Sequence, residues 1–503
     1  MAGAFWTRFT PIPGKVYLVG AGPGDPELLT RKAFRVLSLA DAVLYDNLAN
    51  FALLGFAPQN AERLYVGKKK SAHEFAQEEI ARMLIERARA GQTVVRLKGG
   101  DPYLFGRGGE EAEALFEAGV PFEVVPGVAS MSGLAAYAGI PLTHREHSSS
   151  VTVVTGHEPE RIDWHRTGMT DTLVILMGLT SFAEIARLLV EAGRSPETPA
   201  AAVRWATRPD QEVLVGTLAT LPRLIVESGM KPPATIIVGE VVALRQKLNW
   251  FERLPLFGRL VLVTRPAEQS AELSQKLTEL GAQVIGQPAI ETRSAADSSA
   301  LDQAIANLES YGWLVFTSVN GVRYFVDRLD ASARDLSSVR GKICAIGPAT
   351  ADAIKALHLK VNIVGEEFVA ESLLHAMPET MQGERVLMPR AAVARDVLPL
   401  GLRARGATVD VVEAYRTEAP HDLPALMDHA VSQLRREDWV TFTSSSTVRN
   451  TVSAIGASRL ANVRVATIGP VTSATAREFG IAVAAEASIY TSGGVVEAIL
   501  RVG

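Results

Sequence analysis

The chain has 503 residues, which at about 150 residues per domain predicts about three domains or lobes. Hydrophobic residues make up 47% and charged residues 21% of the chain, a globular composition that excludes disordered, collagen-like and coiled-coil proteins. The 51 Lys and Arg residues against 55 Asp and Glu residues give a net charge of −4. Because a large nucleic-acid surface usually leaves a basic excess, we expect no nucleic-acid partner.

A single cysteine, Cys344, excludes an internal disulfide, a CxxC redox pair and a CxxC zinc site, so we expect no metal. It lies in the apolar run 342–346, where we expect a buried strand. Residues 1–13 carry no apolar signal region, and no stretch reaches the roughly 18 apolar residues of a membrane span. We therefore expect a cytoplasmic protein that does not enter a membrane.

Short apolar strands alternate with amphipathic helices along the first half of the chain. A strand is expected at 15–20, followed by a glycine turn and a helix over 28–39. Further strands are expected at 40–46, 63–67, 93–101, 122–127, 151–156, 172–178, 212–216 and 234–239. This alternation is typical of an α/β sheet. It stalls over 243–257 and restarts with a strand at 258–264, so we place a domain boundary at 250–258.

The second half contains an internal repeat. WLVFTSVNGV at 313–322 matches WVTFTSSSTV at 439–448, and AIGPAT at 345–350 matches TIGPVT at 467–472. Arg265 in VLVTRP aligns with Arg390 in VLMPR at an offset of 125, and GAQV at 281–284 aligns with GATV at the same offset. Four matches in order at nearly one offset predict two similar α/β lobes. A cleft between lobes is a common ligand site.

The loop GAGPGDP at 20–26 follows a strand and precedes a helix, which is the context of a dinucleotide fingerprint. The fingerprint needs a small residue where this loop has Asp25, and Pro23 and Pro26 alter the turn, so we expect no NAD site. A purely structural tight turn remains an alternative. Three more turns, at 96–111, 126–131 and 176–178, also follow predicted strands. Because the carboxyl ends of strands form the ligand crevice of an α/β sheet, the four turns are compatible with one small-molecule site.

Seven motifs in order carry a resemblance over residues 14–250. They are GAGPGDPELLT, LYDNL, VGKKK, RLKGGDPYLFGRGGEE, VPGVAS, GIPLTHR and LMG. Together they resemble uroporphyrinogen-III C-methyltransferase. The resemblance implies a two-lobed α/β tetrapyrrole-methyltransferase fold with S-adenosylmethionine in the cleft and a homodimer formed through this domain.

The resemblance also implies site residues. The cofactor would contact Pro23, Gly99, Gly100, Asp101, Leu104, Ala129, Ser130, Met177 and Ala206. Asp46 would be the proton acceptor and Lys68 the proton donor, with a helix N-cap as the alternative for Asp46 and a solvated lysine for Lys68. The substrate's carboxylates need cationic partners. The candidates are Arg107, Arg145, Lys69 and His144, against plain surface charge or a structural histidine.

The repeat unit of residues 258–503 resembles uroporphyrinogen-III synthase, through VTRP, FTSxNGV, IGPxT and AYRT. The resemblance implies a two-lobed, internally duplicated α/β fold with lobes at 258–292 plus 418–503 and at 293–417. Polar groups at predicted strand ends are the candidate substrate contacts: Thr317, Ser318, Asn320, Ser444, Ser445 and Thr472. Tyr415 matches the family's tyrosine proposed to assist hydroxyl loss, with a half-buried strand tyrosine as the alternative. The alternative for Thr472 is a helix N-cap, and Asn320-Gly321 is expected to begin a helix rather than form a hairpin.

We therefore predict a fused enzyme that converts hydroxymethylbilane to uroporphyrinogen III. It would then transfer two methyl groups from S-adenosylmethionine to give precorrin-2, on the branch toward sirohaem and cobalamin. A competing hypothesis makes the second half a non-catalytic tetrapyrrole-binding or regulatory module. The motif set disfavours a later corrin-pathway methyltransferase, and the charge balance and the second half disfavour an RNA methyltransferase.

Overall fold

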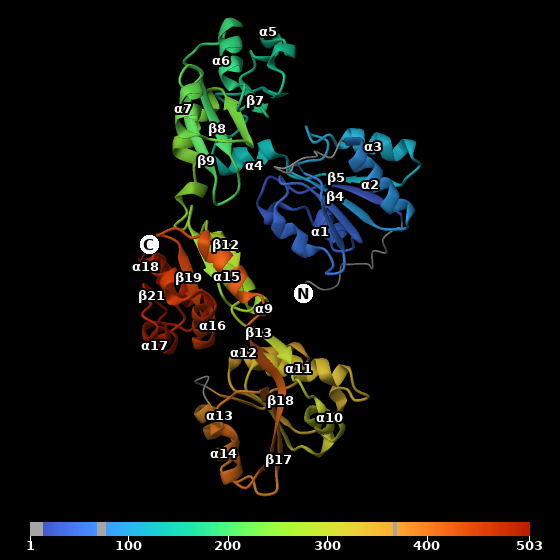
Figure 1. Cartoon of the computed structure of the whole chain (residues 1–503), viewed down its shortest axis with the longest axis vertical. Helices are drawn as coiled ribbons and strands as arrows, with labels where there is room; N and C mark the ends of the chain where they lie inside the picture. Colours follow the sequence, from blue (N-terminus) through green and yellow to red (C-terminus); the bar gives the residue numbers. More distant parts are fainter. Residues whose placement is uncertain (1–13, 68–76, 366–369, 503) are drawn as a thin grey trace. The chain divides into compact units, whose positions relative to one another are not determined.

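The computed structural model describes residues 14–67, 77–365 and 370–502. The chain separates into two compact units, one of residues 1–259 with 277–283 and one of residues 260–276 with 284–503. Residues 277–283 join the first unit because the backbone N–H of Leu256 donates to the Leu280 carbonyl at 2.9 Å. Each unit contains two five- or six-stranded sheets with helices packed on them (Figure 1).

The first sheet of unit one is entirely parallel, in the order β3-β2-β4-β1-β5. Its strands are β1 (Val16–Gly20), β2 (Ala42–Tyr45), β3 (Glu62–Tyr65), β4 (Val94–Lys98) and β5 (Phe122–Val125). Its helices are α1 (Arg31–Leu37), α2 (Gln77–Arg89) and α3 (Gly108–Glu117). Strands β1 and β4 are buried along their whole length, so their apolar runs form a core between two helical layers.

The second sheet is mixed, in the order β6-β7-β10-β8-β9. Its strands are β6 (Val151–Thr155), β7 (Thr172–Leu176), β8 (Pro199–Arg204), β9 (Glu212–Thr217) and β10 (Ala234–Val238). Helix α4 (Ser130–Tyr137) precedes this sheet, and α5 (Trp164–Thr167), α6 (Phe182–Glu191) and α7 (Leu221–Ser228) connect its strands. Because β10 is antiparallel to β7 and β8, its first residues lie beside the carboxyl ends of those strands.

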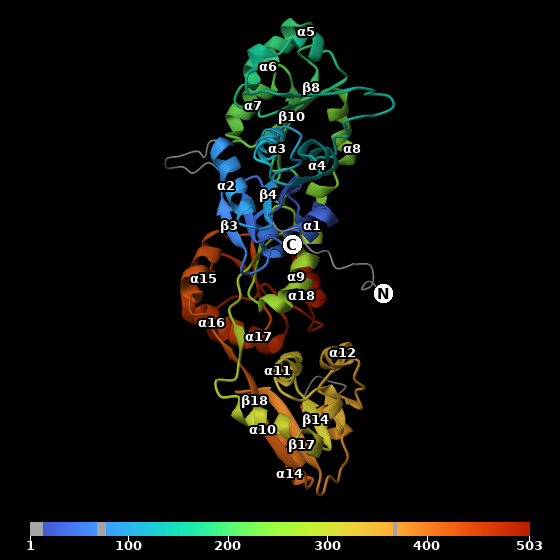
Figure 2. The ribbon, with the colours of Figure 1, turned by 90° about the vertical axis from the view of Figure 1, so that its right-hand side faces the viewer.

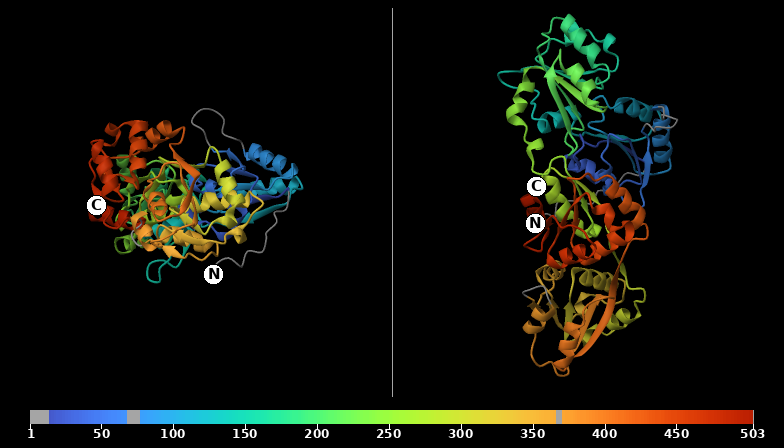
Figure 3. Two further views of the ribbon diagram at one scale, coloured as in Figure 1. Left: turned by 90° about the horizontal axis from the view of Figure 1, so that it is seen from below. Right: turned by 60° about the vertical axis from the view of Figure 1, so that its left-hand side comes forward.

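The sheets of unit two have the orders β12-β11-β19-β20-β21 and β13-β18-β17-β14-β15-β16. The first contains β11 (Leu260–Val263), β12 (Gln283–Gly286), β19 (Trp439–Phe442), β20 (Arg464–Thr467) and β21 (Ala485–Glu486). The second contains β13 (Glu291–Ser294), β14 (Trp313–Phe316), β15 (Lys342–Ala345), β16 (Ile363–Val364), β17 (Arg385–Ala391) and β18 (Thr408–Glu418). We call these sheets and their helices the β11 lobe and the β17 lobe. The chain passes between them after β12 and again after the eleven-residue strand β18 (Figures 2 and 3).

The helices of unit two are assigned to the two lobes by their sheets. Around the β11 lobe lie α9 (Ala267–Glu279), α15 (Leu423–Ser432), α16 (Ser445–Ile455), α17 (Pro470–Glu478) and α18 (Ser492–Val502). Around the β17 lobe lie α10 (Ser299–Ala306), α11 (Val319–Asp330), α12 (Pro348–Ala356), α13 (Ala370–Ala376) and α14 (Val397–Ala404).

The internal repeat is visible in the order of the strands. The order β12-β11-β19-β20-β21 of one lobe corresponds to β18-β17-β14-β15-β16 of the other, and β13 is an additional antiparallel strand. The repeated FTS segments begin equivalent helices, because Ser318 caps α11 and Ser444 caps α16 with nearly the same backbone angles. The prediction of two similar lobes is therefore confirmed, as is the helix start at Asn320-Gly321.

Two expectations about the elements need correction. The helix predicted over 28–39 begins at Arg31, because the Thr30 hydroxyl accepts the Ala33 N–H and caps it there, and a 3-10 turn occupies Pro26–Leu28. Strand β8 is absent from the predicted elements, since its PAAAVR sequence is rich in alanine, a residue with low β propensity. Its alanines are fully buried between helices, so tertiary packing decides its structure.

Cys344 is completely buried in β15, as expected. Burial raises the pKa of its thiol to about 12. Within the parts of the chain that the structure covers, the helices are too short or too polar to cross a bilayer.

Candidate functional site

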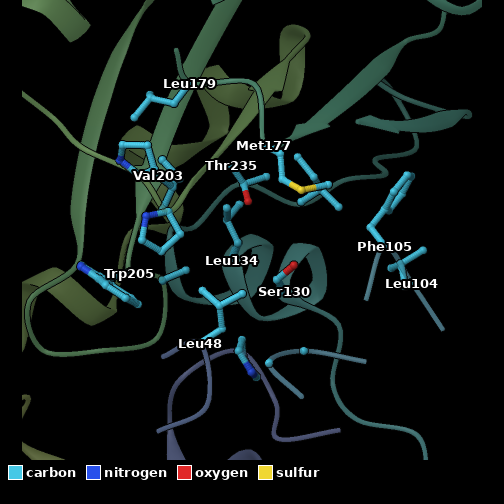
Figure 4. Close-up of a pocket in the computed structure, with 18 of the residues that line it drawn as sticks. Leu48, Leu104, Phe105, Ser130, Leu134, Met177, Leu179, Val203, Trp205 and Thr235 are labelled. Carbon is cyan, nitrogen blue, oxygen red and sulfur yellow. The ribbon is translucent and has the colours of Figure 1, made fainter. Parts of the chain in front are cut away.

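A cavity of about 330 Å³ lies in unit one, and both sheets of that unit contribute to its wall. The first sheet contributes the loops after β1, β2 and β4, through Pro23, Leu48 and the pairs 99–100 and 104–105. The second sheet contributes residues that follow β7 and β8 and the residues that begin β10, such as Thr235. The first turns of α4 complete the wall, with Ser130 and Leu134 (Figure 4). Its volume lies at the lower end of the range of small-molecule sites.

Four glycines bring the loops of the first sheet into backbone contact. A Cβ on Gly20 would lie 2.5 Å from the Gly127 Cα, and a Cβ on Gly127 would lie 2.3 Å from the Gly100 carbonyl oxygen. Gly100 and Gly22 exchange two backbone hydrogen bonds of 2.7 and 3.2 Å. Only glycine permits this approach, which leaves the backbone of 99–100 exposed to the cavity rather than covered by side chains.

Asp101 joins two of these loops. One carboxylate oxygen accepts the Tyr103 N–H at 2.8 Å, and the other accepts the Gly127 N–H at 3.1 Å. Asp101 itself is not in the cavity wall, so its visible role is to fix the position of the glycine loop.

Residues with a left-handed backbone gather around the cavity. Six non-glycine residues in the described ranges have a positive φ, and Phe105, Met177 and Trp205 among them line the cavity. Arg107 and Thr207 lie within two residues of the wall. Each such conformation costs about 1–3 kcal/mol and persists only where surrounding structure imposes it, typically at a ligand site. The strain therefore favours this cavity as the candidate functional site of the unit.

A buried charge network lies directly behind the glycine loop. Glu111 of α3 is fully buried, and its Oε1 accepts from Lys98 Nζ at 2.8 Å, Arg96 Nε at 3.2 Å and Gln77 Nε2 at 2.8 Å. The other end of the Arg96 guanidinium donates to Asp46 Oδ2 at 3.0 Å. Burial, together with the charge of Arg96, lowers the pKa of Lys98 against the opposing effect of Glu111.

The network positions Asp46, the predicted proton acceptor. Its second oxygen, Oδ1, accepts the Leu48 N–H at 3.0 Å, so both carboxylate oxygens have partners. The alternative of a helix N-cap is wrong, because Asn50 caps the following 3-10 helix. Lys68, the predicted proton donor, and Lys69 lie outside the described residues.

The structure brings most of the predicted cofactor residues to one cavity. Those that line it are Pro23, Gly99, Gly100, Leu104, Ser130, Met177 and Ala206. Ala129 precedes the wall residue Ser130 as the N-cap of α4. Figure 4 shows Met177 and Leu48 on opposite sides of the cavity, with Trp205 at one end and Phe105 at the other.

The three described candidates for substrate carboxylates are separated. Arg107 flanks the glycine loop, is 61% exposed, and forms an ion pair with Glu110 at 2.6 Å. His144 and Arg145 lie in a tight turn that closes on Ser148, whose hydroxyl contacts Thr172 at the amino end of β7. The cavity lies at the carboxyl end of β7, so the structure does not bring His144 and Arg145 to it.

The candidate residues of unit two occupy the starts of helices. The hydroxyl of Ser318 accepts the Gly321 N–H, and that of Ser444 accepts the Thr447 N–H, so both serines act as N-caps. Ser445 accepts a hydrogen bond from Thr475 at 2.8 Å. Thr317 directly follows β14. Thr472 is buried at the third position of α17, so the N-cap alternative is wrong for this residue, and the cap is Gly469.

Tyr415 and Ser318 are in contact. Their hydroxyl oxygens are 3.0 Å apart, and the Tyr415 ring stacks on Tyr324 with centroids 5.4 Å apart. Tyr415 is only 7% exposed and is therefore buried rather than half-buried. Asn320 accepts a hydrogen bond from Gln269 at 3.4 Å.

Sequence reasoning missed the far wall of the cavity and the residues behind it. Phe105 follows the predicted contact Leu104, and Trp205 precedes the predicted contact Ala206, so both could have been found from their position in the sequence. Thr235 and the Pro232-Pro233 pair have no motif and are recognisable only from the pairing of β10 with β7. Arg96, Lys98 and Glu111 stand inside quoted motifs, but their mutual contact requires the fold.

Two family models match the chain. Tetrapyrrole (corrin/porphyrin) methylases match residues 15–222, and uroporphyrinogen-III synthase HemD matches residues 271–497. The porphyrin biosynthesis protein HemD of Ruminiclostridium josui is 38% identical over 498 residues, which are 97% of this chain and 98% of that protein. The chain therefore belongs to the same family as this two-region porphyrin biosynthesis protein. It is a bifunctional tetrapyrrole biosynthesis enzyme, with a methylase region at 15–222 and a synthase region at 271–497, as the motifs predicted.

Two further comparisons concern the methylase region alone. The siroheme synthase of Chromobacterium violaceum is 52% identical over 244 residues, which are 48% of this chain and 52% of that enzyme. The chain thus spans about half the length of that relative. The uroporphyrin-III C-methyltransferase of Thermus thermophilus, solved with S-adenyl homocysteine, is 47% identical and has a TM-score of 0.40. The match covers 46% of this chain and 99% of that one.

Proposed function

We propose that the chain catalyses two consecutive reactions. The synthase region cyclises hydroxymethylbilane to uroporphyrinogen III, and the methylase region transfers two methyl groups from S-adenosylmethionine to that product, giving precorrin-2. The observation that carries the proposal is the presence of both regions in one chain, since the product of one reaction is the substrate of the other. The match to a two-region relative over nearly its whole length supports it.

The cavity of the methylase region is the proposed site of S-adenosylmethionine. Its residues fit a molecule with one polar and one apolar end. The Gly99-Gly100 backbone would meet polar groups, and the Met177 and Ala206 side of the wall would take the adenine. The ligand of the Thermus thermophilus relative, S-adenyl homocysteine, supports the proposal. Asp101 and Ala129 would act by holding the backbone of this wall.

The methyl transfer mainly requires alignment of the two reactants. S-adenosylmethionine supplies a sulfonium methyl group that a pyrrole carbon of the substrate attacks. Asp46 then accepts a proton from the methylated macrocycle, and the ion pair with Arg96 keeps its carboxylate oriented for this role. Lys68 remains our proposed proton donor. Arg107 would meet a substrate carboxylate beside the glycine loop, whereas a role for His144, Arg145 or Lys69 stays a prediction.

The synthase region needs to hold a bent linear tetrapyrrole. We propose that the Tyr415 hydroxyl, positioned by Ser318, donates a hydrogen bond to the leaving hydroxyl as the pyrrole ring electrons break the C–O bond. The N–H proton of that ring is released with the hydroxyl, so that water departs. The far pyrrole then closes the ring through a spiro intermediate. The N–H groups at the starts of α11, α16 and α17 would bind substrate carboxylates, with Thr317, Asn320, Ser444, Ser445 and Thr472 beside them.

We also propose that the enzyme is a cytoplasmic homodimer formed through its methylase region and serves the sirohaem or cobalamin branch. It would need no metal and no NAD, and would bind neither nucleic acid nor membrane. The single cysteine supports the absence of a CxxC metal site, and the net charge of −4 supports the absence of a nucleic-acid partner.

Cyclisation of freshly prepared hydroxymethylbilane without S-adenosylmethionine tests the synthase activity. The product is oxidised and its isomers I and III are separated by chromatography. We expect isomer III to dominate. Isomer I alone, formed at the rate seen without enzyme, would make the second half a tetrapyrrole-binding module instead.

A further inference from the structure

Arg265 stands at the carboxyl end of β11, where the polar ends of the parallel strands meet. It directly follows Thr264, whose hydroxyl donates to the Thr441 carbonyl of the neighbouring strand β19 at 2.8 Å. The next turn along this edge carries Ser444. Arg265 is therefore at the same edge of the sheet as proposed substrate contacts of the synthase region.

The guanidinium of Arg265 is half-buried and has only neutral partners among the described side chains. Its Nε donates to Gln269 Oε1 at 3.3 Å, and one terminal nitrogen lies 3.5 Å from the Ser492 hydroxyl. Among the described side chains no carboxylate forms an ion pair with it, and Glu272 pairs with Lys276 instead, at 3.8 Å. Burial lowers the pKa of this guanidinium, and the more distant charge of Glu272 opposes that effect.

The duplicated lobe provides a natural comparison. Arg390 occupies the equivalent position at the end of β17, 125 residues later, and its guanidinium forms an ion pair with Asp396 at 2.5 Å. At the same offset, 125 residues before Asp396, the β11 lobe has Ala271. Among the side chains that the structure describes, one copy of the repeat thus supplies its arginine with a carboxylate, and the other copy does not.

A planar guanidinium matches a carboxylate in a two-pronged geometry, and such pairs are preferred where a carboxylate must be recognised. Hydroxymethylbilane carries acetate and propionate groups on its pyrrole rings. We propose that Arg265 binds a carboxylate of the linear tetrapyrrole and thereby anchors one end of the substrate in the β11 lobe. This inference rests on the proposed synthase activity.

Gln269 extends the site. Its Oε1 accepts from Arg265 and its Nε2 donates to Asn320, a proposed substrate contact at the start of α11. The amide therefore keeps the guanidinium in place without neutralising it, so the charge stays available for the substrate.

Two variants test the proposal by opposite routes. Arg265→Gln removes the charge, and Gln269→Glu keeps Arg265 but gives it a carboxylate of nearly the same shape as the glutamine. We expect either variant to raise the KM for hydroxymethylbilane at least about tenfold, with a much smaller change in kcat. The isosteric Gln269→Glu variant guards against a failure of Arg265→Gln to fold.

Arg390→Gln is the matched control, because its guanidinium is already paired with Asp396. We expect it to leave the KM within about twofold of the wild-type value. An unchanged KM in both Arg265→Gln and Gln269→Glu would overturn the assignment of Arg265, as would an equal rise in the Arg390→Gln control. If the wild-type chain itself forms no isomer III, it is the proposed synthase activity that fails.

Discussion

The methylase and synthase regions build their sites in different ways. In the methylase region, glycine loops and strained residues shape a cavity of about 330 Å³, and a buried charge network supports it from behind. In the synthase region, most candidate side chains lie at the starts of helices, and Ser318 and Ser444 use their hydroxyls as N-caps. Our proposed substrate contacts there combine backbone N–H groups and polar side chains at these helix starts with Tyr415 and the half-buried guanidinium of Arg265.

The difference corresponds to the chemistry that each region performs. Methyl transfer requires two reactants in line, which favours a rigid preformed cavity. The bilane cyclises unaided to the wrong isomer, so the synthase has to select a conformation by holding the chain at several points. Substitutions in the methylase region should therefore act on stability and cofactor affinity, and substitutions in the synthase region on rate and isomer selection.

The largest expected effect concerns the support of the cavity. Glu111→Ala removes the carboxylate that the buried Arg96 and Lys98 share and leaves Arg96 with Asp46 alone, and we expect it to destabilise the methylase region by about 3–5 kcal/mol. Hydrogen exchange of peptides from β4 and α3 measures this locally, since the two units need not unfold together. The control is Glu110→Ala, whose ion pair is solvent-screened and should contribute no more than about 1 kcal/mol. Equal exchange rates in the two variants would contradict a supporting role for the network.

Tyr415→Phe tests the role of the Tyr415 hydroxyl in the synthase region. If its hydroxyl assists the departure of water, kcat for isomer III should fall by about 10²-fold. The control is Tyr324→Phe, which loses a hydroxyl bonded to the Thr292 carbonyl but keeps the stacked ring. A purely structural role of the Tyr415 hydroxyl would give the two variants similar kcat values.

Ser130→Tyr tests whether the cavity binds the cofactor. The larger side chain fills part of the cavity from the first turn of α4, and we expect at least about tenfold weaker binding of S-adenosylhomocysteine. Ser132 lies on the same helix but is exposed, so Ser132→Tyr should bind normally. Calorimetric titration of both variants makes the comparison, and unchanged affinity in Ser130→Tyr would place the cofactor elsewhere.

The smallest effect is a pH dependence in the first sheet. Hydrogen bonds from Lys15 and Lys32 lower the pKa of the Glu123 carboxyl. These contacts of ionised Glu123 therefore stabilise the folded state at pH values above the unfolded pKa of about 4.3. That contribution disappears as the pH falls through the folded pKa. Glu123→Gln should thus cost less than about 1 kcal/mol near neutral pH and nothing in acid. Urea unfolding at both pH values measures this, and a difference that persists in acid would show a cause other than charge.

The sequence predicts the methylase site better than the synthase site, for a physical reason. Gly99 and Gly100 are recognisable in the sequence because only glycine permits such a close backbone approach, so the motif has to contain glycine at these positions. Glu111 is as important to the wall but resembles any glutamate of an amphipathic helix until the fold buries it. Strand β8 was not predicted, because its alanines have a low β propensity and adopt a strand only through their burial in the fold.

In the synthase region the FTS repeats predict the starts of helices rather than a reactive group, since a capping serine and a binding serine look alike in sequence. The repeat itself carries more information. Aligning Arg265 with Arg390 makes the two copies comparable, but only the structure shows that Asp396 pairs with Arg390 and that no described carboxylate pairs with Arg265.

One reaction mixture tests the central claim that both regions act in sequence. Purified enzyme is supplied with hydroxymethylbilane and S-adenosylmethionine together, and the products are separated and analysed by mass spectrometry. We predict a doubly methylated tetrapyrrole of the isomer III series. Isomer I without methylated product, from an enzyme that still methylates added uroporphyrinogen III, would contradict the claim and leave the methylase as the sole activity.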